Sequence, residues 1–140
     1  MTKTFVRVAF TAAVAAGVFV VLGGAPSAAQ DKGLTIKEIM KAGHGGTDPL
    51  LKQIIFANKD GKWEAVVAAA KSLDSNAALL HKATPGKGDA ESWEKLAGGY
   101  HKNTTALLAA AEKKDADGVK TSVSAIQGAC KACHSAHKGK

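Results

Sequence analysis

Apolar residues recur every three or four positions along most of the chain after residue 34, which is the spacing of one face of an α-helix. The longest such stripe comprises Trp63, Val66, Val67, Ala70, Leu73, Ala77 and Leu80. A second stripe comprises Trp93, Leu96, Ala97, Tyr100, Leu107, Leu108 and Ala111. No run of alternating β-branched residues interrupts these stripes, so this part of the sequence predicts amphipathic helices and no strand.

The first helical segment has a clear start and an internal break. Thr35, with Glu38 three positions later, forms a capping-box pattern that predicts a helix start. The segment GHGGTDP, residues 43–49, then interrupts the apolar pattern. We expect a kink or a short loop there, followed by a restart in which Asp48 is the N-cap and Pro49 is the first helical residue.

The remaining segments are bounded in the same way. The second helix is predicted to begin near Asp60, and the loop ATPGKGD, residues 83–89, separates it from a third helix over about Ala90 to Lys114. Asp115 is placed to cap a fourth helix. The apolar stripe of that helix is Val119, Val123, Ile126, Cys130 and Cys133. Four amphipathic helices with short connections predict an all-α fold, an antiparallel four-helix bundle.

The first 29 residues have the layout of a secretory signal peptide. Lys3 and Arg7 precede an uncharged apolar run over 8–22, and small residues follow after glycines and a proline. An uncleaved membrane anchor is the alternative, but a spanning helix needs about 20 apolar residues and this run is shorter. We therefore predict that residues 1–29 are cleaved and that residues 30–140 form one domain, periplasmic and without a membrane span.

Loss of the signal segment changes the charge only slightly. Lys3 and Arg7 leave with it, so 17 of the 19 basic residues remain against 12 acidic ones, and the formal charge falls from +7 to +5. A lysine-rich surface steers a protein toward acidic partners. Nucleic-acid binding is not expected, because Arg7 is the only arginine of the chain and bidentate arginine contacts are therefore missing.

The chemistry of the sequence is concentrated in CKACH, residues 130–134. Cys130 and Cys133 are the only cysteines, and with His134 they stand at i, i+3 and i+4, which places all three on one face of a helix. C-x-x-C-H is the attachment pattern of c-type haem. Two thiols less than one turn apart are able to add to two vinyl groups on one edge of a porphyrin, while the adjacent imidazole reaches the iron as proximal ligand. The pattern predicts one covalent haem c.

Other interpretations of the two thiols stay open from the sequence. A disulfide between Cys130 and Cys133 suits an oxidising compartment but leaves His134 without a role. A thioredoxin-like pair requires a helix N-terminus in a βαβ unit, and neither is predicted here. A zinc site would need a fourth ligand such as His137, which would crowd the same turn as His134.

With this motif at the end of a fourth helix, residues 34–138 resemble the class II c-type cytochromes, the cytochrome c prime group. The resemblance implies an exported four-helix bundle with haem c attached near the end of the last helix. It also implies that the first helix approaches the sixth position of the iron, which carries a methionine in low-spin members and is open in high-spin members. Family members often dimerise through the first two helices, so the resemblance allows a homodimer.

Met40, on the inner face of the first predicted helix, is the candidate for that sixth position. A thioether ligand raises the potential of a haem, although core packing is an ordinary use of methionine. His44 is the rival ligand one turn later, but its glycine-rich surroundings favour a loop or surface role. We expect His81, His101 and His137 to be solvated. Where the family often has an arginine near the haem propionates this chain has Lys138, which keeps the charge without the bidentate contact.

Three functions follow from these patterns. The first is one-electron transfer by a haem with His134 and Met40 as axial ligands, exchanging electrons with acidic redox partners. The second is binding of nitric oxide or carbon monoxide at an open sixth position. The third is an exported helical protein with a structural disulfide or metal site. No catalytic motif stands out from the charged residues, so we do not expect an enzyme.

Overall fold

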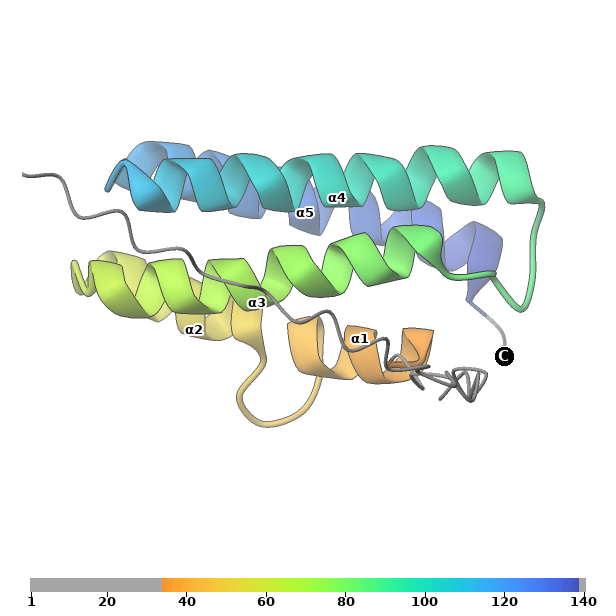
Figure 1. Cartoon of the computed structure of the whole chain (residues 1–140), viewed down its shortest axis with the longest axis horizontal. Coiled ribbons are helices and arrows are strands. Elements are labelled where there is room, and N and C mark those ends of the chain that lie inside the picture. The colour runs from red at the N-terminus through yellow and green to blue at the C-terminus, as the bar shows by residue number, and fades with distance from the viewer. Residues whose placement is uncertain (1–33, 139–140) are drawn as a thin grey trace, which may run out of the picture. The chain divides into compact units, whose positions relative to one another are not determined.

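The computed structural model describes residues 34–138 and contains five α-helices and no strand in that range (Figure 1). The helices are α1 (Ile36–His44), α2 (Leu50–Lys59), α3 (Trp63–Lys82), α4 (Ala90–Glu112) and α5 (Ala116–His137). The pair α1 and α2 takes the place of one bundle helix, so the predicted antiparallel four-helix bundle is confirmed. The predicted signal peptide and its boundary at residue 30 lie outside the described residues.

The helix starts follow the predicted capping residues with one exception. The Thr35 amide donates to the Glu38 carboxylate at 2.8 Å, and the Glu38 amide donates to the Thr35 hydroxyl at 3.2 Å, which completes the capping box of α1. Asp115 accepts from a backbone amide at 2.9 Å and caps α5. Each such cap contributes about 1 kcal/mol. The sequence therefore sets the starts of both helices that carry the predicted site residues.

The restart of the first bundle helix differs from the prediction. Pro49, and not Asp48, is the N-cap of α2, which begins at Leu50 without a side-chain cap. Pro49 has φ −71° and ψ 151°, an extended conformation that keeps it outside the helix. The Asp48 carboxylate instead accepts a hydrogen bond from the Gln53 side chain at 3.1 Å. Asp48 therefore ties the loop to the first turn of α2 without capping it.

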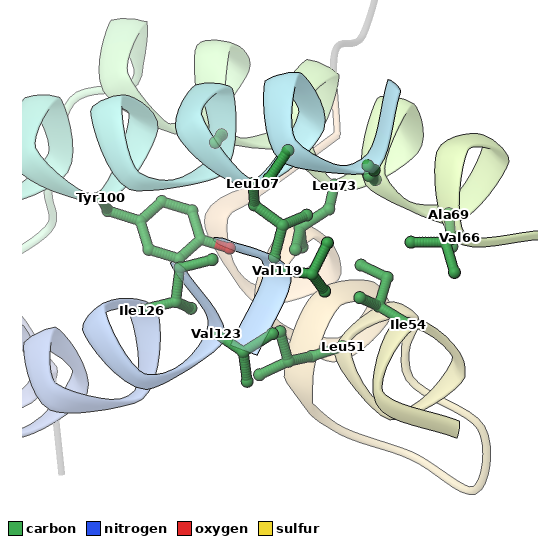
Figure 2. Packing of buried hydrophobic residues seen from close by; sticks show 14 of the residues in the cluster. Leu51, Ile54, Val66, Ala69, Leu73, Tyr100, Leu107, Val119, Val123 and Ile126 are labelled. Carbon is green, nitrogen blue, oxygen red and sulfur yellow. The ribbon is translucent and has the colours of Figure 1, made fainter. Parts of the chain in front are cut away.

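The core lies where the predicted apolar stripes meet (Figure 2). Ile54, Leu73, Leu107 and Ile126, one from each of the four bundle positions, are fully buried. Trp63 and Val67, at the start of the α3 stripe, are only partly buried against this core. Within residues 34–138, no helix combines the length and the hydrophobicity that a membrane crossing requires.

The break between α1 and α2 opens one end of the bundle. Helix α2 has Cα atoms within 8 Å of both α3 and α5, whereas α1 has Cα neighbours at that distance in α2 and α3 only. No Cα atom of Ile36–His44 comes within 8 Å of a Cα atom of Ala116–His137. The loop that separates α1 from α2 contains Gly46 at φ +76°, a left-handed conformation that glycine adopts readily. The two helices that carry the predicted haem ligands therefore stand apart at the end where those ligands lie.

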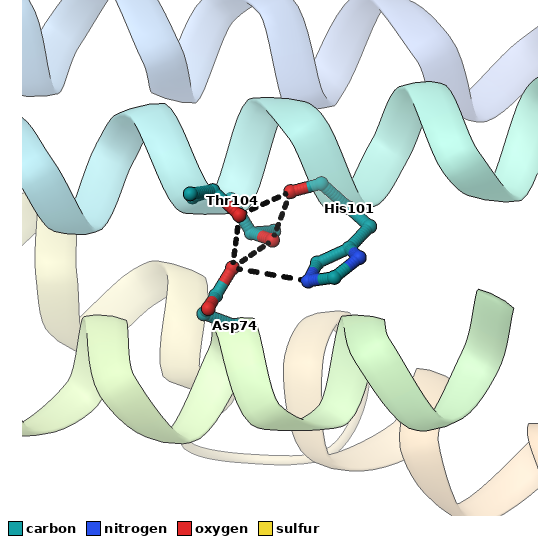
Figure 3. A network of polar contacts seen from close by, with 4 residues as sticks. Asp74, His101 and Thr104 are labelled. Carbon is teal, nitrogen blue, oxygen red and sulfur yellow. Dashed lines mark hydrogen bonds and ion pairs between the residues drawn. The ribbon is translucent and has the colours of Figure 1, made fainter. Parts of the chain in front are cut away.

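A polar network joins α3 to α4 beside the core (Figure 3). The Asp74 carboxylate accepts from the hydroxyls of Thr104 and Thr105 at 2.8 and 2.9 Å, and His101 Nε2 lies 3.7 Å from the same oxygen. His81 contacts Glu94 at 2.7 Å between the same helices. The expectation that His81 and His101 are solvated holds only in part: their side chains are 29% and 32% exposed, and each also contacts an acidic residue across the two helices.

Candidate functional site

Helix α5 brings the three motif residues to one side of its last turns. Cys130 and Cys133 are half-buried and their thiols are free, and His134 is exposed one residue further on. The Cys130 thiol donates to the backbone carbonyl of Ile126 at 3.5 Å. Burial, and secondarily the neighbouring Cys130, raise the pKa of Cys133. The motif therefore presents a protonated Cys133 thiol and an accessible imidazole on adjacent positions.

These residues form one wall of a cavity of about 390 Å³, which we call the CKACH cavity. Helix α1 forms the facing wall with Met40 and His44, and Tyr100 of α4 lies between them. The remaining lining residues are Lys37, Lys41, Gly45, Leu80, Leu96, Ala97 and Ala129. The cavity is the space left where α1 departs from α5, and its volume lies in the roughly 300–1,000 Å³ range of cofactor sites.

The structure thus brings together all four predicted site residues. Met40 is half-buried and lines the same cavity as Cys130, Cys133 and His134, although 90 positions separate it from the first cysteine. Lys138, proposed from the sequence for a haem propionate, is exposed and does not line this cavity. The cations that do line it are Lys37 and Lys41, one turn apart on α1 and on either side of Met40.

His44 occupies a different place from the one expected. It is the last residue of α1, it is half-buried, and its Nε2 lies 2.8 Å from the Tyr100 hydroxyl in a hydrogen bond. Burial, and secondarily the nearby His134, lower the pKa of His44. The expected loop or surface role is wrong because α1 continues through Gly43 and ends at His44, so the imidazole belongs to the helix and lines the cavity.

Tyr100 is the residue of the site that the sequence did not identify. It counted there as one member of an apolar stripe, yet its hydroxyl faces the CKACH cavity and bonds His44. Burial, and secondarily the neighbouring Cys130, raise the pKa of Tyr100 well above its usual range. The signal available in the sequence was only that Tyr100 is the single tyrosine of the chain and carries a polar group on a core stripe.

His137 is also not solvated, and its position bears on the zinc interpretation. Its ring is buried against Trp93, its Nδ1 lies 2.8 Å from the carbonyl of Lys87, and its Nε2 lies 3.1 Å from the Ser92 hydroxyl. Both nitrogens are therefore engaged with the α3–α4 loop and the start of α4. In residues 34–138 no group of three or more His, Cys, Asp or Glu side chains is placed to hold a metal ion.

The donor set of the CKACH cavity fits a covalently attached haem. Two free thiols at i and i+3 match two vinyl groups on one porphyrin edge, and an imidazole stands directly after the second thiol. A thioether faces them from α1, and the walls between are formed mainly by leucine, alanine and the tyrosine ring. Cofactor sites between facing helices are an established feature of four-helix bundles.

Comparison with known proteins agrees with this geometry. A family model described as Cytochrome C' matches residues 37–138. Neither the comparison with curated proteins nor that with solved structures gave a match. Proteins of the matched family bind covalent haem c, serve in electron transfer or gas binding, and are generally haem carriers or binders rather than enzymes. Since the match covers more than half of the sequence, from the second residue of α1 to the residue after α5, the chain belongs to the cytochrome c' family, a family of c-type haem proteins.

Proposed function

We propose that this chain is an exported one-electron carrier, with one haem c attached at Cys130 and Cys133. His134 is the proximal ligand and Met40 the sixth ligand of the iron. The observation that carries the proposal is that Met40 and the CKACH motif line one cavity, although they lie on two helices with no Cα atoms within 8 Å of each other. A covalently held haem supplies one-electron redox chemistry at its iron.

The proposed attachment of haem to the two cysteines is an addition reaction that releases no atoms. Each thiol adds its sulfur and its hydrogen across one vinyl double bond, so two thioethers form and nothing is released. Half-burial keeps the Cys133 thiol protonated before attachment, because desolvation disfavours the thiolate. Two covalent bonds then retain in place a group that one small cavity would otherwise hold by packing alone.

The axial residues determine what the iron does. His134 donates an imidazole nitrogen from the last turns of α5, and Met40 donates a thioether from α1. With His134 and Met40 filling both positions, no ligand exchange would be needed when the bound haem changed oxidation state, which suits electron transfer. A thioether opposite an imidazole also favours the ferrous state and so raises the potential.

Lysines around the cavity support a role in docking acidic partners. Lys37 and Lys41 are exposed where they line the cavity, close to the position proposed for the haem. They are also the cations available there to neutralise the two haem propionates. An acidic redox partner steered by this charge would dock beside the group with which it exchanges an electron.

The exposed apolar side chains of α2 support self-association. Ile55 is 41% exposed and Phe56 is 56% exposed, although both are large and apolar. We propose a homodimer that covers this face of α2. Sedimentation of the purified protein tests it: the wild type should be a dimer that Phe56→Glu converts to a monomer, and a wild type that sediments as a monomer would refute the dimer.

One observation favours gas binding as a second candidate. In a cavity with mainly apolar walls, Tyr100 and His44 provide a neutral hydrogen-bonding pair beside the place that a small iron-bound ligand would occupy. This function requires an open sixth position, and therefore a Met40 that packs in the wall without contacting the iron. The two candidate functions differ in whether the Met40 sulfur binds the haem iron. Absorption spectra of the oxidised protein distinguish them.

The test is the spin state of the oxidised protein, purified from cells that attach haem c. Electron transfer with Met40 ligation predicts a low-spin ferric spectrum that becomes high-spin in Met40→Ala. The spectrum should be unchanged in the control variant Leu79→Ala, which truncates a side chain outside the cavity. Leu79 is 44% exposed and lies on α3 away from the cavity lining. A high-spin wild type that shifts on adding nitric oxide would replace the first candidate by the second.

A further inference from the structure

Two polar side chains meet inside the CKACH cavity, and neither has a role in the electron transfer proposed above. His44 ends α1 and Tyr100 stands in the middle of α4, 56 positions away. Their rings meet edge to face with centroids 5.6 Å apart, and the Tyr100 hydroxyl lies 2.8 Å from His44 Nε2. Met40, one turn before His44 on the same face of α1, shares this cavity.

The hydrogen bond occupies Nε2, one of the two ring nitrogens through which a histidine binds a metal. In one tautomer Nε2 carries no proton, and its lone pair accepts the hydroxyl hydrogen of Tyr100. In the other tautomer Nε2 carries a proton and donates it to the hydroxyl oxygen. A metal requires the free lone pair of a neutral imidazole nitrogen. Neither tautomer offers that lone pair at Nε2 while the bond to Tyr100 is intact.

Packing around the pair keeps the bond in place. A Cβ atom on Gly43 would lie 3.1 Å from a methyl group of Leu73 and 3.8 Å from the Tyr100 hydroxyl. The absence of a side chain at Gly43 therefore lets α1 lie close against α3 and α4 at this level. Tyr100 is itself buried, and a hydrogen bond in a weakly polar surrounding is stronger than one in water.

We propose that Tyr100 is a positioning residue that selects the sixth ligand of the haem iron by holding His44 away from it. The hydrogen bond leaves the thioether of Met40 as the side chain of α1 that is free to ligate. The inference rests on the proposed attachment of haem at the CKACH motif. It goes beyond that proposal because it assigns the choice between two available ligands to a third residue.

Variants that lack the Met40 thioether test whether Tyr100 keeps His44 from binding the iron. We would compare Met40→Ala with Met40→Ala/Tyr100→Phe, each as full-length haem-loaded protein, by electron paramagnetic resonance and by absorption of the ferric state. The Phe substitution deletes one oxygen and keeps the ring. We expect Met40→Ala to be high-spin and Met40→Ala/Tyr100→Phe to be low-spin with two nitrogen ligands. Adding His44→Asn to the double variant should restore the high-spin signal.

Two results would overturn the inference. A Met40→Ala protein that is already low-spin through His44 would show that Tyr100 does not restrain the imidazole. A Met40→Ala/Tyr100→Phe protein that stays high-spin would show that freeing His44 does not let it reach the iron. The intact mass of each sample separates these results from failure of the proposed function, because a chain without attached haem refutes the attachment site itself.

Two controls test whether a change in spin state comes from misfolding or from the loss of any histidine contact between helices. His81→Gln in the Met40→Ala background removes another histidine contact between helices, outside the cavity, and should leave the spin state unchanged. If the double variant fails to fold by circular dichroism, Tyr100→Phe alone supplies the second measurement. Its iron should gain a low-spin component with two nitrogen ligands at the expense of the thioether-ligated one. Complete retention of the wild-type spectrum would contradict the proposal.

Discussion

At the scale of single residues, the account depends on side chains whose ionisation is fixed by burial. His44 and Tyr100 both stand in a cavity where charge is disfavoured, so the pKa of His44 is lowered and that of Tyr100 is raised. Both are therefore neutral near neutral pH, and the pair adds hydrogen-bonding capacity to the cavity without adding charge.

The lowered pKa of His44 predicts a pH dependence of unfolding. An unfolded histidine titrates near 6.5, above the folded pKa of His44, so between these values the unfolded chain binds more protons. The unfolding free energy should therefore fall as pH drops through about 6.5 toward the folded pKa. Urea unfolding of the wild type and of His44→Asn, between pH 8 and pH 5, measures this contribution. An identical pH slope in both proteins would contradict it.

At the scale of elements, the shortest helix, α1, carries both candidates for the sixth ligand of the iron. Helix α1 has nine residues and holds Met40 and His44, and its own hydrogen bonds are too few to stabilise it alone. The capping box of Thr35 and packing against α2 and α3 therefore keep it helical. Its position depends on these contacts, and so does the distance of its side chains from the motif on α5.

Loss of the cap should loosen α1 locally. Thr35→Ala removes the hydroxyl that accepts from the Glu38 amide and should cost roughly 1 kcal/mol, which corresponds to about fivefold faster amide exchange in α1. Exchange in the middle of α4 should not change. Hydrogen exchange followed by mass spectrometry makes the comparison. Thr47→Ala, in the loop before α2, is the control, and equal acceleration in both variants would refute a specific role of the cap.

The helices of this chain follow from its sequence more closely than do the contacts between them. Local signals predicted the helices well: the capping residues Thr35 and Asp115 begin α1 and α5, and the turn at 83–89 separates α3 from α4. The motif spacing likewise placed both thiols on one face. His44 and His137 were misplaced, because their burial depends on contacts with helices distant in sequence, and periodicity reports only which face is apolar.

At the scale of the whole molecule, charge and helix arrangement act together. Residues 30–140 carry a formal charge of +5, and two of the lysines stand where the cavity meets solvent. The divergence of α1 from α5 places this cavity at the same end as the motif. The site of electron exchange would then coincide with part of the positive surface.

Electron exchange with an acidic redox protein should therefore depend on salt. The second-order rate should fall severalfold when ionic strength rises from about 0.01 M to 0.15 M, because the Debye length shortens from roughly 30 Å to 8 Å. Lys37→Gln/Lys41→Gln should weaken this dependence, whereas Lys102→Gln/Lys113→Gln, which removes the same charge away from the cavity, should weaken it less. Stopped-flow absorption measures the rate. A rate independent of salt would refute steering by charge.

The most direct test of the central claim is the mass of the matured protein and of its C-terminal peptide. From cells that attach c-type haem, we expect the intact chain to carry the mass of one haem, located after digestion on the peptide that contains Cys130 and Cys133. Cys130→Ala/Cys133→Ala should have the mass of the bare polypeptide. A wild-type protein with that bare mass, purified from the same cells, would contradict the account.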